Sequence, residues 1–206
     1  MKTSMLRRAW EALTRKCQTC SRVRLGLGIA VIAVLVAGGL MAAGAAGLAW
    51  TNTEGFCIGC HEMRDNVYAE FKDTIHDKNR SGVRAICSDC HVPREPVAML
   101  RRKVSATFEL WGHFVTGIID TKEKFEKHRY DMARRVWIRM KETDSLECRN
   151  CHTEAAMNAE LQSQRARNRH EKAKAQGSTC IDCHYGIAHK EPEGPGPDEL
   201  KLGQNP

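Results

Sequence analysis

Eight of the ten cysteines fall in one pattern, Cys-x-x-Cys-His, which occurs four times. The cysteines of the four copies are Cys57, Cys60, Cys87, Cys90, Cys148, Cys151, Cys180 and Cys183, and the histidines are His61, His91, His152 and His184. In this pattern two thiols form thioether bonds to a haem, and the histidine is placed to ligate its iron. Zinc sites also use paired cysteines, but they need no histidine directly after each pair. A disulfide framework would leave the histidines unexplained. The repeats therefore predict four covalently bound c-type haems.

The iron atoms of four such haems need further axial ligands, and the chain offers five more histidines. These are His76, His113, His128, His170 and His189. His189 follows His184 by five residues and cannot easily reach the iron of its own motif, so it suits a neighbouring haem. His76 and His170 lie on segments leading into the second and fourth motifs.

Three of the five, His76, His170 and His189, are thus predicted distal ligands. We expect His113 at the surface, and His128 has no clear assignment. Three distal histidines for four irons leave one haem without a histidine on its distal side. Met63 stands two residues after the first motif and is a candidate ligand there.

The part of the chain that carries the four motifs has few residues with which to position these groups. Residues 51–206 provide 39 residues per haem, too few for a conventional core around each one. We therefore expect a mainly α fold of helices and loops packed on haem faces, which does not form without haem. The first cysteines of the motifs are 30, 61 and 32 residues apart, which predicts two di-haem modules, about 51–95 and 143–190, in a domain spanning 51–190. The segment 191–206 is rich in proline and glycine and is expected to be a flexible tail.

Apolar residues at helical spacing predict three helices, over 62–75, 96–118 and 122–141. Pro96 fits the first turn of the second one. A fourth, very polar helix is predicted over 153–175, with Gly177 as its C-cap.

Residues 25–50 form an apolar run of 26 residues without a charge. As a helix this run is roughly 39 Å long, enough to cross a hydrocarbon core of roughly 30 Å. The basic segment 1–24 precedes it, so we expect a single transmembrane anchor with a cytoplasmic tail and a periplasmic haem domain at the bacterial inner membrane. The alternative is a cleaved signal peptide ending near Ala43-Gly44-Ala45, but the run and its polar lead are long for that.

The formal charge of +7 does not indicate nucleic-acid binding. Residues 1–24 carry seven bases and one acid, whereas residues 51–206 carry 25 bases and 24 acids. The excess is therefore a basic tail beside a membrane.

Two further features of the first 50 residues carry weak signals. Gly39, Ala43 and Gly47 share one helix face and could pack a homodimer, although an Ala/Gly-rich span explains them equally well. Cys17 and Cys20 form a Cys-x-x-Cys without histidine on the reducing side of the membrane, away from haem attachment. A thiol switch or a shared metal there rests on spacing alone.

Several stretches beyond the haem motifs resemble the NapC/NirT family of membrane-anchored tetrahaem cytochromes, and the likeness looks greatest to the NapC branch. They are Asn52-Thr53-Glu54 with Phe56 to Met63, Arg80-Ser-Gly-Val-Arg84, Cys87 to Pro93, Lys124 to Arg129, Glu147 to His152 and Cys180 to His189. The resemblance implies a protein that oxidises a quinol, either menaquinol or ubiquinol, and feeds a periplasmic reductase. The NapC branch serves periplasmic nitrate reductase.

The resemblance also implies axial ligands. Met63 would bind the first iron, with His61 as the alternative. The pairs for the second, third and fourth haems would be His91 with His189, His152 with His76, and His184 with His170, although His76 and His170 could be exchanged.

The quinol site implied by the resemblance lies beside the first haem, at Lys103 and Glu109. A quinol releases two protons, so a carboxylate such as Glu109 can accept one while Lys103 holds a quinol oxygen. Without the resemblance, Lys103 reads as one of three bases, Arg101 to Lys103, that meet lipid headgroups. Two other functions stay open: electron flow from a periplasmic oxidoreductase into the quinone pool, and a terminal reductase acting at an open haem.

Overall fold

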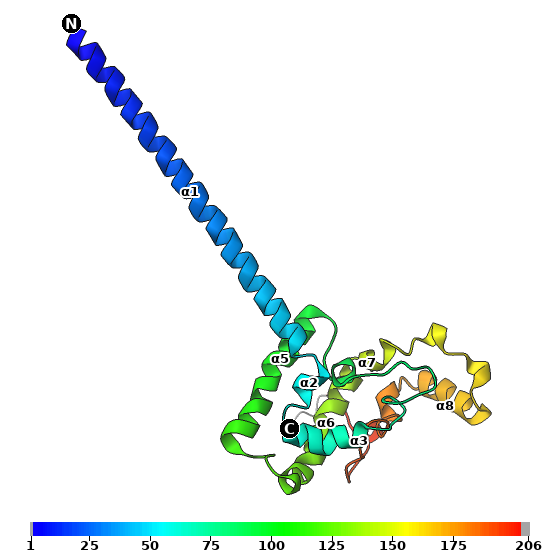
Figure 1. Cartoon of the computed structure of the whole chain (residues 1–206). Helices are drawn as coiled ribbons and strands as arrows, with labels where there is room; N and C mark the ends of the chain where they lie inside the picture. The colour runs from blue at the N-terminus through cyan, green and yellow to red at the C-terminus, as the bar shows by residue number, and fades with distance from the viewer. Residues whose placement is uncertain (1, 203–206) are drawn as a thin grey trace. The chain divides into compact units, whose positions relative to one another are not determined.

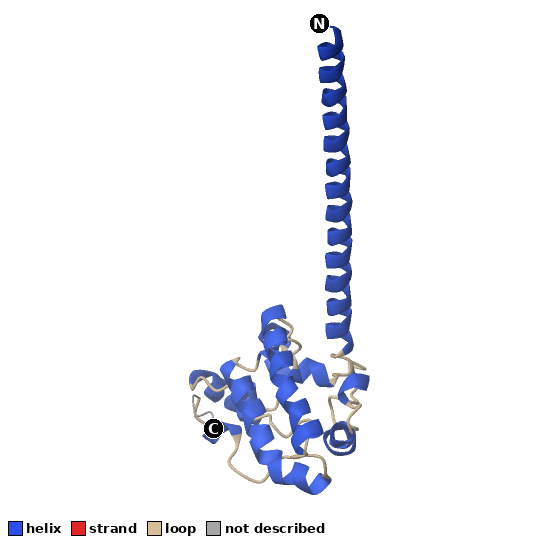
Figure 2. Cartoon of the chain, turned by 90° about the vertical axis from the view of Figure 1, so that its left-hand side faces the viewer, coloured by secondary structure: helices blue, strands red, loops and turns tan. Residues whose placement is uncertain are grey.

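The computed structural model describes the backbone of residues 2–202 and the side chains of residues 22–202. Within that range the protein is helical and contains no strand (Figure 2). The chain divides into two compact units, Met1–Trp50 and Thr51–Pro206. The mainly α fold expected from the sequence is confirmed.

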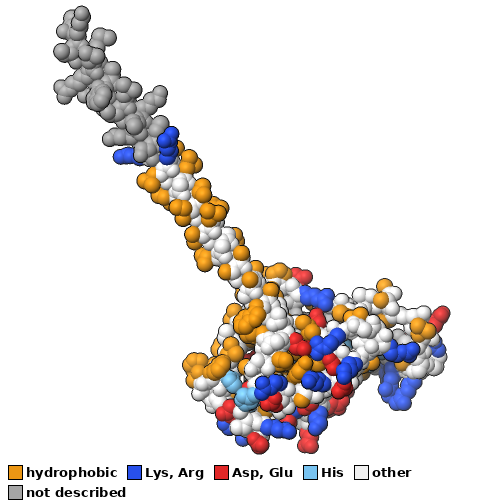
Figure 3. Space-filling model, viewed as in Figure 1, with side chains coloured by type: hydrophobic (Ala, Val, Ile, Leu, Met, Phe, Trp, Pro, Cys, Tyr) orange, Lys and Arg blue, Asp and Glu red, His pale blue; other side chains and the backbone are white. Residues whose placement is uncertain are grey.

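The first unit is a single long helix, α1 (Lys2–Trp50) (Figure 1). Its part from Arg22 to Trp50 has a mean hydropathy of 2.5 over its most apolar window, and none of that window is buried within the protein. Figure 3 shows apolar side chains along this part. Such a helix is long and apolar enough to cross a membrane. The side chains of Cys17 and Cys20 lie outside the described residues.

The second unit consists of the long helices α5 and α6, shorter helices and their connections (Figure 1). In chain order its elements are α2 (Glu54–Cys57), η1 (Met63–Tyr68), α3 (Ala69–Phe71), α4 (Cys87–His91), α5 (Pro96–Trp111), η2 (Gly112–Thr116), α6 (Lys122–Glu142), α7 (Leu146–Arg149), η3 (Glu154–Ala156), η4 (Ala159–Leu161), α8 (Gln164–Ala175), η5 (Cys180–Asp182) and η6 (Pro197–Glu199). The elements η1 and η2 are π-helical turns, and η3 to η6 are 3₁₀ turns.

The two long helices of this unit agree with the apolar stripes of the sequence. Helix α5 begins at Pro96 and continues through η2 to Gly117, whose φ of 58° ends the helix. A Cβ atom at Gly117 would lie 2.8 Å from a carboxylate oxygen of Asp120, so the position requires glycine. Helix α6 begins after Thr121, whose hydroxyl accepts a hydrogen bond from the Lys124 N–H at 3.3 Å.

The other two predicted helices are shorter than their sequence patterns indicated. The helix predicted over 62–75 ends at Phe71, because Lys72 leaves the helical conformation with a ψ of 137° and Asp73 follows with a left-handed φ of 68°. The helix predicted over 153–175 forms only from Gln164, after Ser163 caps it. Leu161 is 87% exposed, so the preceding segment has no apolar face to bury and folds only as the 3₁₀ turns η3 and η4.

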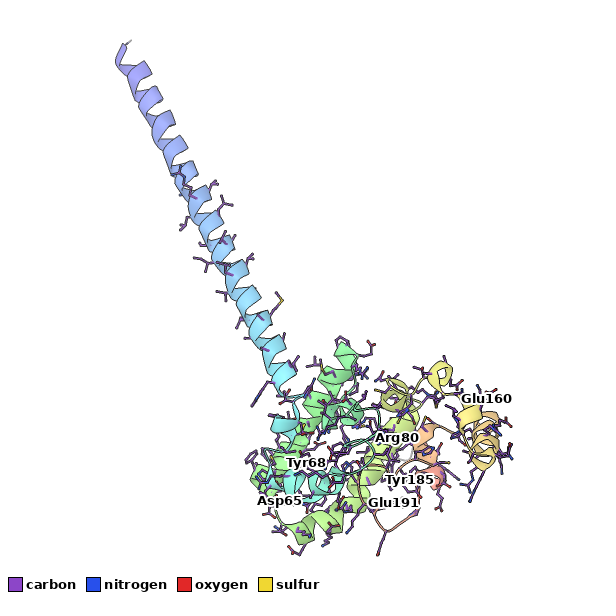
Figure 4. The ribbon with its side chains drawn as sticks, turned by 45° about the vertical axis from the view of Figure 1, so that its right-hand side comes forward. Asp65, Tyr68, Arg80, Glu160, Tyr185 and Glu191 are labelled. Carbon is purple, nitrogen blue, oxygen red and sulfur yellow. The ribbon has the colours of Figure 1, made fainter. Side chains whose placement is uncertain are left out.

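The apolar core of the haem domain is small. Among the described residues its centre is Trp137 and Met140 of α6 with Ile181 of η5, and Tyr185, labelled in Figure 4, packs against them. The rings of Trp137 and Tyr185 meet edge to face, with centroids 5.5 Å apart. Large apolar side chains of α5, such as Phe108 and Trp111, stay exposed.

The C-terminal segment is more ordered than the predicted flexible tail. Pro197 is fully buried, and the Lys141 ammonium donates to the carbonyl oxygens of Pro197 at 2.6 Å and Leu200 at 3.0 Å. The same ammonium pairs with Asp182, inside the fourth motif, at 2.8 Å. The structure thus differs from the expectation over 191–202, and residues 203–206 lie outside the described range.

Candidate haem centres

Four pairs of imidazole rings face each other in the haem domain, and each contains one motif histidine. The pairs and their ring-centroid separations are His61 with His113 at 5.9 Å, His91 with His189 at 6.1 Å, His76 with His152 at 6.2 Å, and His170 with His184 at 6.1 Å. Three of the pairs combine the residues that the resemblance implied for the second, third and fourth haems. All nine histidines except His128 belong to a pair.

The separations and the unpaired thiols both fit a haem. Two imidazoles bound end-on to one metal, at roughly 2 Å per bond, have ring centroids about 6 Å apart. The eight motif cysteines are free thiols, available for thioether bonds.

Buried guanidinium nitrogens provide a further sign of a missing anion. Nε and Nη2 of Arg139 and Nε of Arg102 are buried without a hydrogen-bond partner. Both charges act on the nearby imidazole of His91. The carboxylates of a haem could accept hydrogen bonds from these nitrogens, which are costly to bury without a partner. The residues present therefore fit the cofactor.

The pair for the second haem is the most enclosed. Burial, followed by the charge of His189, lowers the pKa of His91 to about 3, so this imidazole is neutral and able to bind a metal. The Nδ1–H of His189 donates to the carbonyl oxygen of Val67 at 3.1 Å. The next residue, Lys190, donates its backbone N–H to Glu70 at 3.0 Å. These contacts attach His189 and Lys190, which follow the fourth motif, to the η1–α3 region.

In the remaining two pairs, His76 and His152 are distant in the sequence, whereas His170 and His184 are only 14 residues apart. Nδ1 of His170 on α8 hydrogen-bonds the Gln162 side-chain oxygen at 2.8 Å. Nδ1 of His76 is buried without a partner. Because His76 precedes the second motif but faces His152 of the third, and His189 follows the fourth motif but faces His91 of the second, the two predicted modules would share ligands.

The motifs lie next to each other in chain order. The thiol of Cys87 forms a hydrogen bond with that of Cys57, which lowers the pKa of Cys57 to about 7 and links the first two motifs. Arg94, just after the second motif, reaches Sγ of Cys151 in the third at 3.9 Å. Cys148 of the third motif and Cys180 of the fourth are close enough to raise the pKa of Cys148 in addition to burial, its main cause. Each motif thus lies close to the next one in chain order.

The surroundings of the first motif differ from the sequence expectation. His113 was expected at the surface, but its side chain is only 21% exposed and faces His61. Its Nδ1 bonds the carboxylate of Glu62, a residue that is 3% exposed. Met63, the implied ligand, is 40% exposed. No sequence pattern links Glu62 to His113, because 51 residues separate them.

Lys103 and Glu109 lie on the same helix but make different contacts. The Lys103 ammonium donates to the carbonyl oxygen of Thr51 at 2.9 Å, and its charge lowers the pKa of Cys57 in the first motif. Burial lowers the pKa of Lys103 itself. Glu109 is 62% exposed and pairs with Arg102 at 3.0 Å. The structure thus places Lys103 beside the first motif and turns Glu109 to another face of α5.

Comparisons with known proteins agree with this arrangement. A family model described as "NapC/NirT cytochrome c family, N-terminal region" matches residues 18–194. The chain is 54% identical over 184 residues to the denitrification system component NirT of Stutzerimonas stutzeri, with 89% of each chain covered. It is 46% identical over 194 residues to the cytochrome c-type protein NapC of Escherichia coli K12, with 93% of each chain covered.

A third relative carries the haem count in its name. This putative tetrahaem cytochrome c of Allochromatium vinosum is 48% identical over 149 residues, which cover 72% of this chain and 80% of the relative. No solved structure matches. The chain belongs to the NapC/NirT cytochrome c family, whose members are membrane-anchored tetrahaem cytochromes that transfer electrons from quinol to periplasmic reductases.

Proposed function

We propose that this protein oxidises quinol beside its first haem motif, at Lys103, and delivers the electrons to a periplasmic nitrate reductase. The likeness to NapC supports this partner, and the likeness to a denitrification system component keeps it within nitrogen-oxide respiration. The N-terminus would be cytoplasmic and the haem domain periplasmic, because the basic residues precede the apolar part of α1.

The chain's own residues would hold the four haems. The eight motif cysteines would form the thioether bonds, and the facing histidines would be the axial ligands of the second, third and fourth haems. When bound, the haems supply one-electron carriers for the two electrons of a quinol. Because each motif lies close to the next one, electrons entering at the first haem could pass in turn to the second, third and fourth haems.

The position of Lys103 carries the proposal. Its hydrogen bond to Thr51 holds it against the residue that directly follows the apolar helix in the sequence. An ammonium group has three donors, and Thr51 uses one of them. The others can hold a quinol oxygen close to Cys57.

Glu109 has less structural support as the proton acceptor. Its carboxylate is held by Arg102 in two contacts, at 3.0 and 3.2 Å. Glu109 is an exposed carboxylate on the same helix, and it would receive the proton only if its ion pair with Arg102 breaks. Glu109→Gln is therefore expected to slow quinol oxidation less than a change at Lys103.

The test compares Lys103→Met with Arg101→Met in the full-length protein in liposomes. Arg101 is an exposed base on the same helix, so its loss removes a neighbouring positive charge and leaves the Thr51 contact intact. We expect Lys103→Met to lose quinol oxidation at least tenfold with all four haems attached, and Arg101→Met to keep it. An equal loss in both variants would mean that these bases bind lipid headgroups, and an unchanged Lys103→Met would refute the site.

A further inference from the structure

Helix α8 (Gln164–Ala175), which lies between the third and fourth motifs, gathers positive charge at the surface. It carries five of the 25 bases of residues 51–206 and only one of their 24 acids, which leaves 20 bases and 23 acids on the rest of that segment. Figure 3 shows Lys and Arg side chains at the end of the domain where Figure 1 places α8. The helix is therefore a basic patch on a domain that is otherwise slightly acidic.

Three of the bases form one face of the helix, the α8 basic face. Arg165, Arg169 and Lys172 follow one another at intervals of four and three residues, which places them within about 60° of each other around the helix axis. All three residues are exposed, and among the described residues none of them has a hydrogen bond or an ion pair. Lys174, on the opposite side of the helix, instead pairs with Glu154 at 2.9 Å. The charges of the α8 basic face are therefore not matched within this chain.

The same helix carries one residue of the least enclosed histidine pair. His170 and His184 are both exposed, whereas each of the other three pairs contains at least one partly buried histidine. Cys183, which precedes His184, is exposed as well. His170 follows Arg169 directly, about 100° further around the helix. A protein that covers the α8 basic face and the adjoining surface would therefore lie close to the fourth motif.

An anionic lipid surface is a poor match for α8. Helices that lie on a membrane combine a basic face with large apolar side chains on the other face. The apolar residues of α8 are only Ala166, Ala173 and Ala175, so the helix has no large side chain to insert into lipid. An acidic protein surface needs no such insertion, because complementary charges steer and orient two soluble surfaces. The composition of α8 thus favours a protein partner.

We propose that the α8 basic face is the docking surface for the periplasmic electron acceptor, and that this acceptor carries an acidic patch beside its own redox centre. The inference rests on the proposed function, because it takes the periplasmic reductase as the partner. The oxidised centre of the acceptor would gain each electron that the reduced fourth haem loses. Charges of this kind act mainly on the rate at which the two proteins meet, and salt weakens them.

The test uses the full-length protein in liposomes, with its haems reduced by quinol and then reoxidised by soluble periplasmic nitrate reductase and nitrate. Haem absorbance gives the rates of both steps. The α8 variant combines Arg165→Gln, Arg169→Gln and Lys172→Gln. The matched control removes three exposed bases of other segments, by Lys127→Gln, Arg135→Gln and Lys201→Gln.

The expected result is a loss of rate that depends on salt and is confined to the second step. At about 0.01 M salt, where charges act over roughly 30 Å, we expect the reductase to reoxidise the α8 variant about tenfold more slowly than the unchanged protein and the control. At about 1 M salt, where the range is roughly 3 Å, the three proteins should be reoxidised at equal rates. Quinol should reduce all three at the same rate, with four haems attached.

Several results would overturn the docking surface. Equal slowing of the α8 variant and the control would mean that net charge acts and α8 does not. A rate for the unchanged protein that does not fall with salt would also contradict the proposal, and this result needs no variant to assemble. Slowing in liposomes that contain phosphatidylglycerol but not in pure phosphatidylcholine would assign the face to lipid.

Failure of the docking surface and failure of the proposed function are distinguishable. If the reductase reoxidises the unchanged protein and the α8 variant equally fast at low salt, the docking surface alone is wrong. If it does not reoxidise the unchanged protein at all, the proposed function is wrong, and the docking surface with it.

Discussion

The Ser145 hydroxyl ties the end of α6 to the fourth haem motif, and its removal should destabilise the domain measurably. Ser145 is fully buried. Its Oγ accepts a hydrogen bond from the backbone N–H of Ile181 at 3.1 Å and another from the hydroxyl of Thr179 at 2.7 Å. Ile181 stands between the two cysteines of the motif and is itself 6% exposed. Ser145→Ala therefore leaves a buried N–H without a partner.

The expected cost follows from those two bonds. An unsatisfied buried donor costs about 1–3 kcal/mol, so we expect Ser145→Ala to lower the free energy of unfolding by about 2 kcal/mol. With a guanidinium slope of about 4 kcal/mol per molar, the unfolding midpoint should fall by about 0.5 M. The measurement is guanidinium unfolding of the full-length haem protein in detergent, followed by circular dichroism.

Ser145→Gly provides a matched comparison. Ser145 has a left-handed φ of 51°, which costs a non-glycine residue about 1 kcal/mol. Glycine loses the same two hydrogen bonds but removes that strain, so its midpoint should lie between those of the unchanged protein and Ser145→Ala. A Ser145→Ala midpoint within about 0.1 M of the unchanged protein would refute the argument that this hydroxyl supports the motif.

Two more predictions concern the charge network and the cofactor. Arg129→Met should lower the melting temperature by about 10 °C, because the Arg129 side chain is 10% exposed and its guanidinium pairs with Glu70 at 2.7 and 2.9 Å. Arg129→Lys should recover only part of this loss, and full recovery would mean that charge alone matters. The full-length chain produced without haem should show no cooperative unfolding of residues 51–202, because the apolar core of this domain is a small cluster around Trp137. A cooperative transition would contradict the view that haem completes the core.

The parts of the fold that the sequence predicted are those with a repeated local signal. The apolar run before Thr51 and the stripes of α5 and α6 appear in the structure as helices, although α1 begins at Lys2, well before the apolar run. The four motifs predicted the c-type haems, and they also predict which eight cysteines would attach them. Local periodicity and fixed spacing need no knowledge of the tertiary structure, so they can be read from one sequence.

The missed parts depend on contacts between distant residues. The order of 191–202 comes from Lys141, which donates to two carbonyl oxygens of a segment with no periodicity of its own. The approach of His113 to His61 requires α5 to turn through η2, which no residue pattern announces. Glu109, which the resemblance implied for the quinol site, stays a prediction there, although it pairs with Arg102 and lies on another face of α5 from Lys103.

The central claim is that electrons pass from quinol through this protein to a separate reductase. The most direct test places the full-length protein in quinol-containing liposomes and follows haem absorbance, first alone, then with nitrate, and then with soluble periplasmic nitrate reductase added. We predict that quinol reduces the haems, that nitrate alone leaves them reduced, and that the reductase with nitrate reoxidises them. Haems that quinol does not reduce, or that nitrate reoxidises without the reductase, would contradict the account.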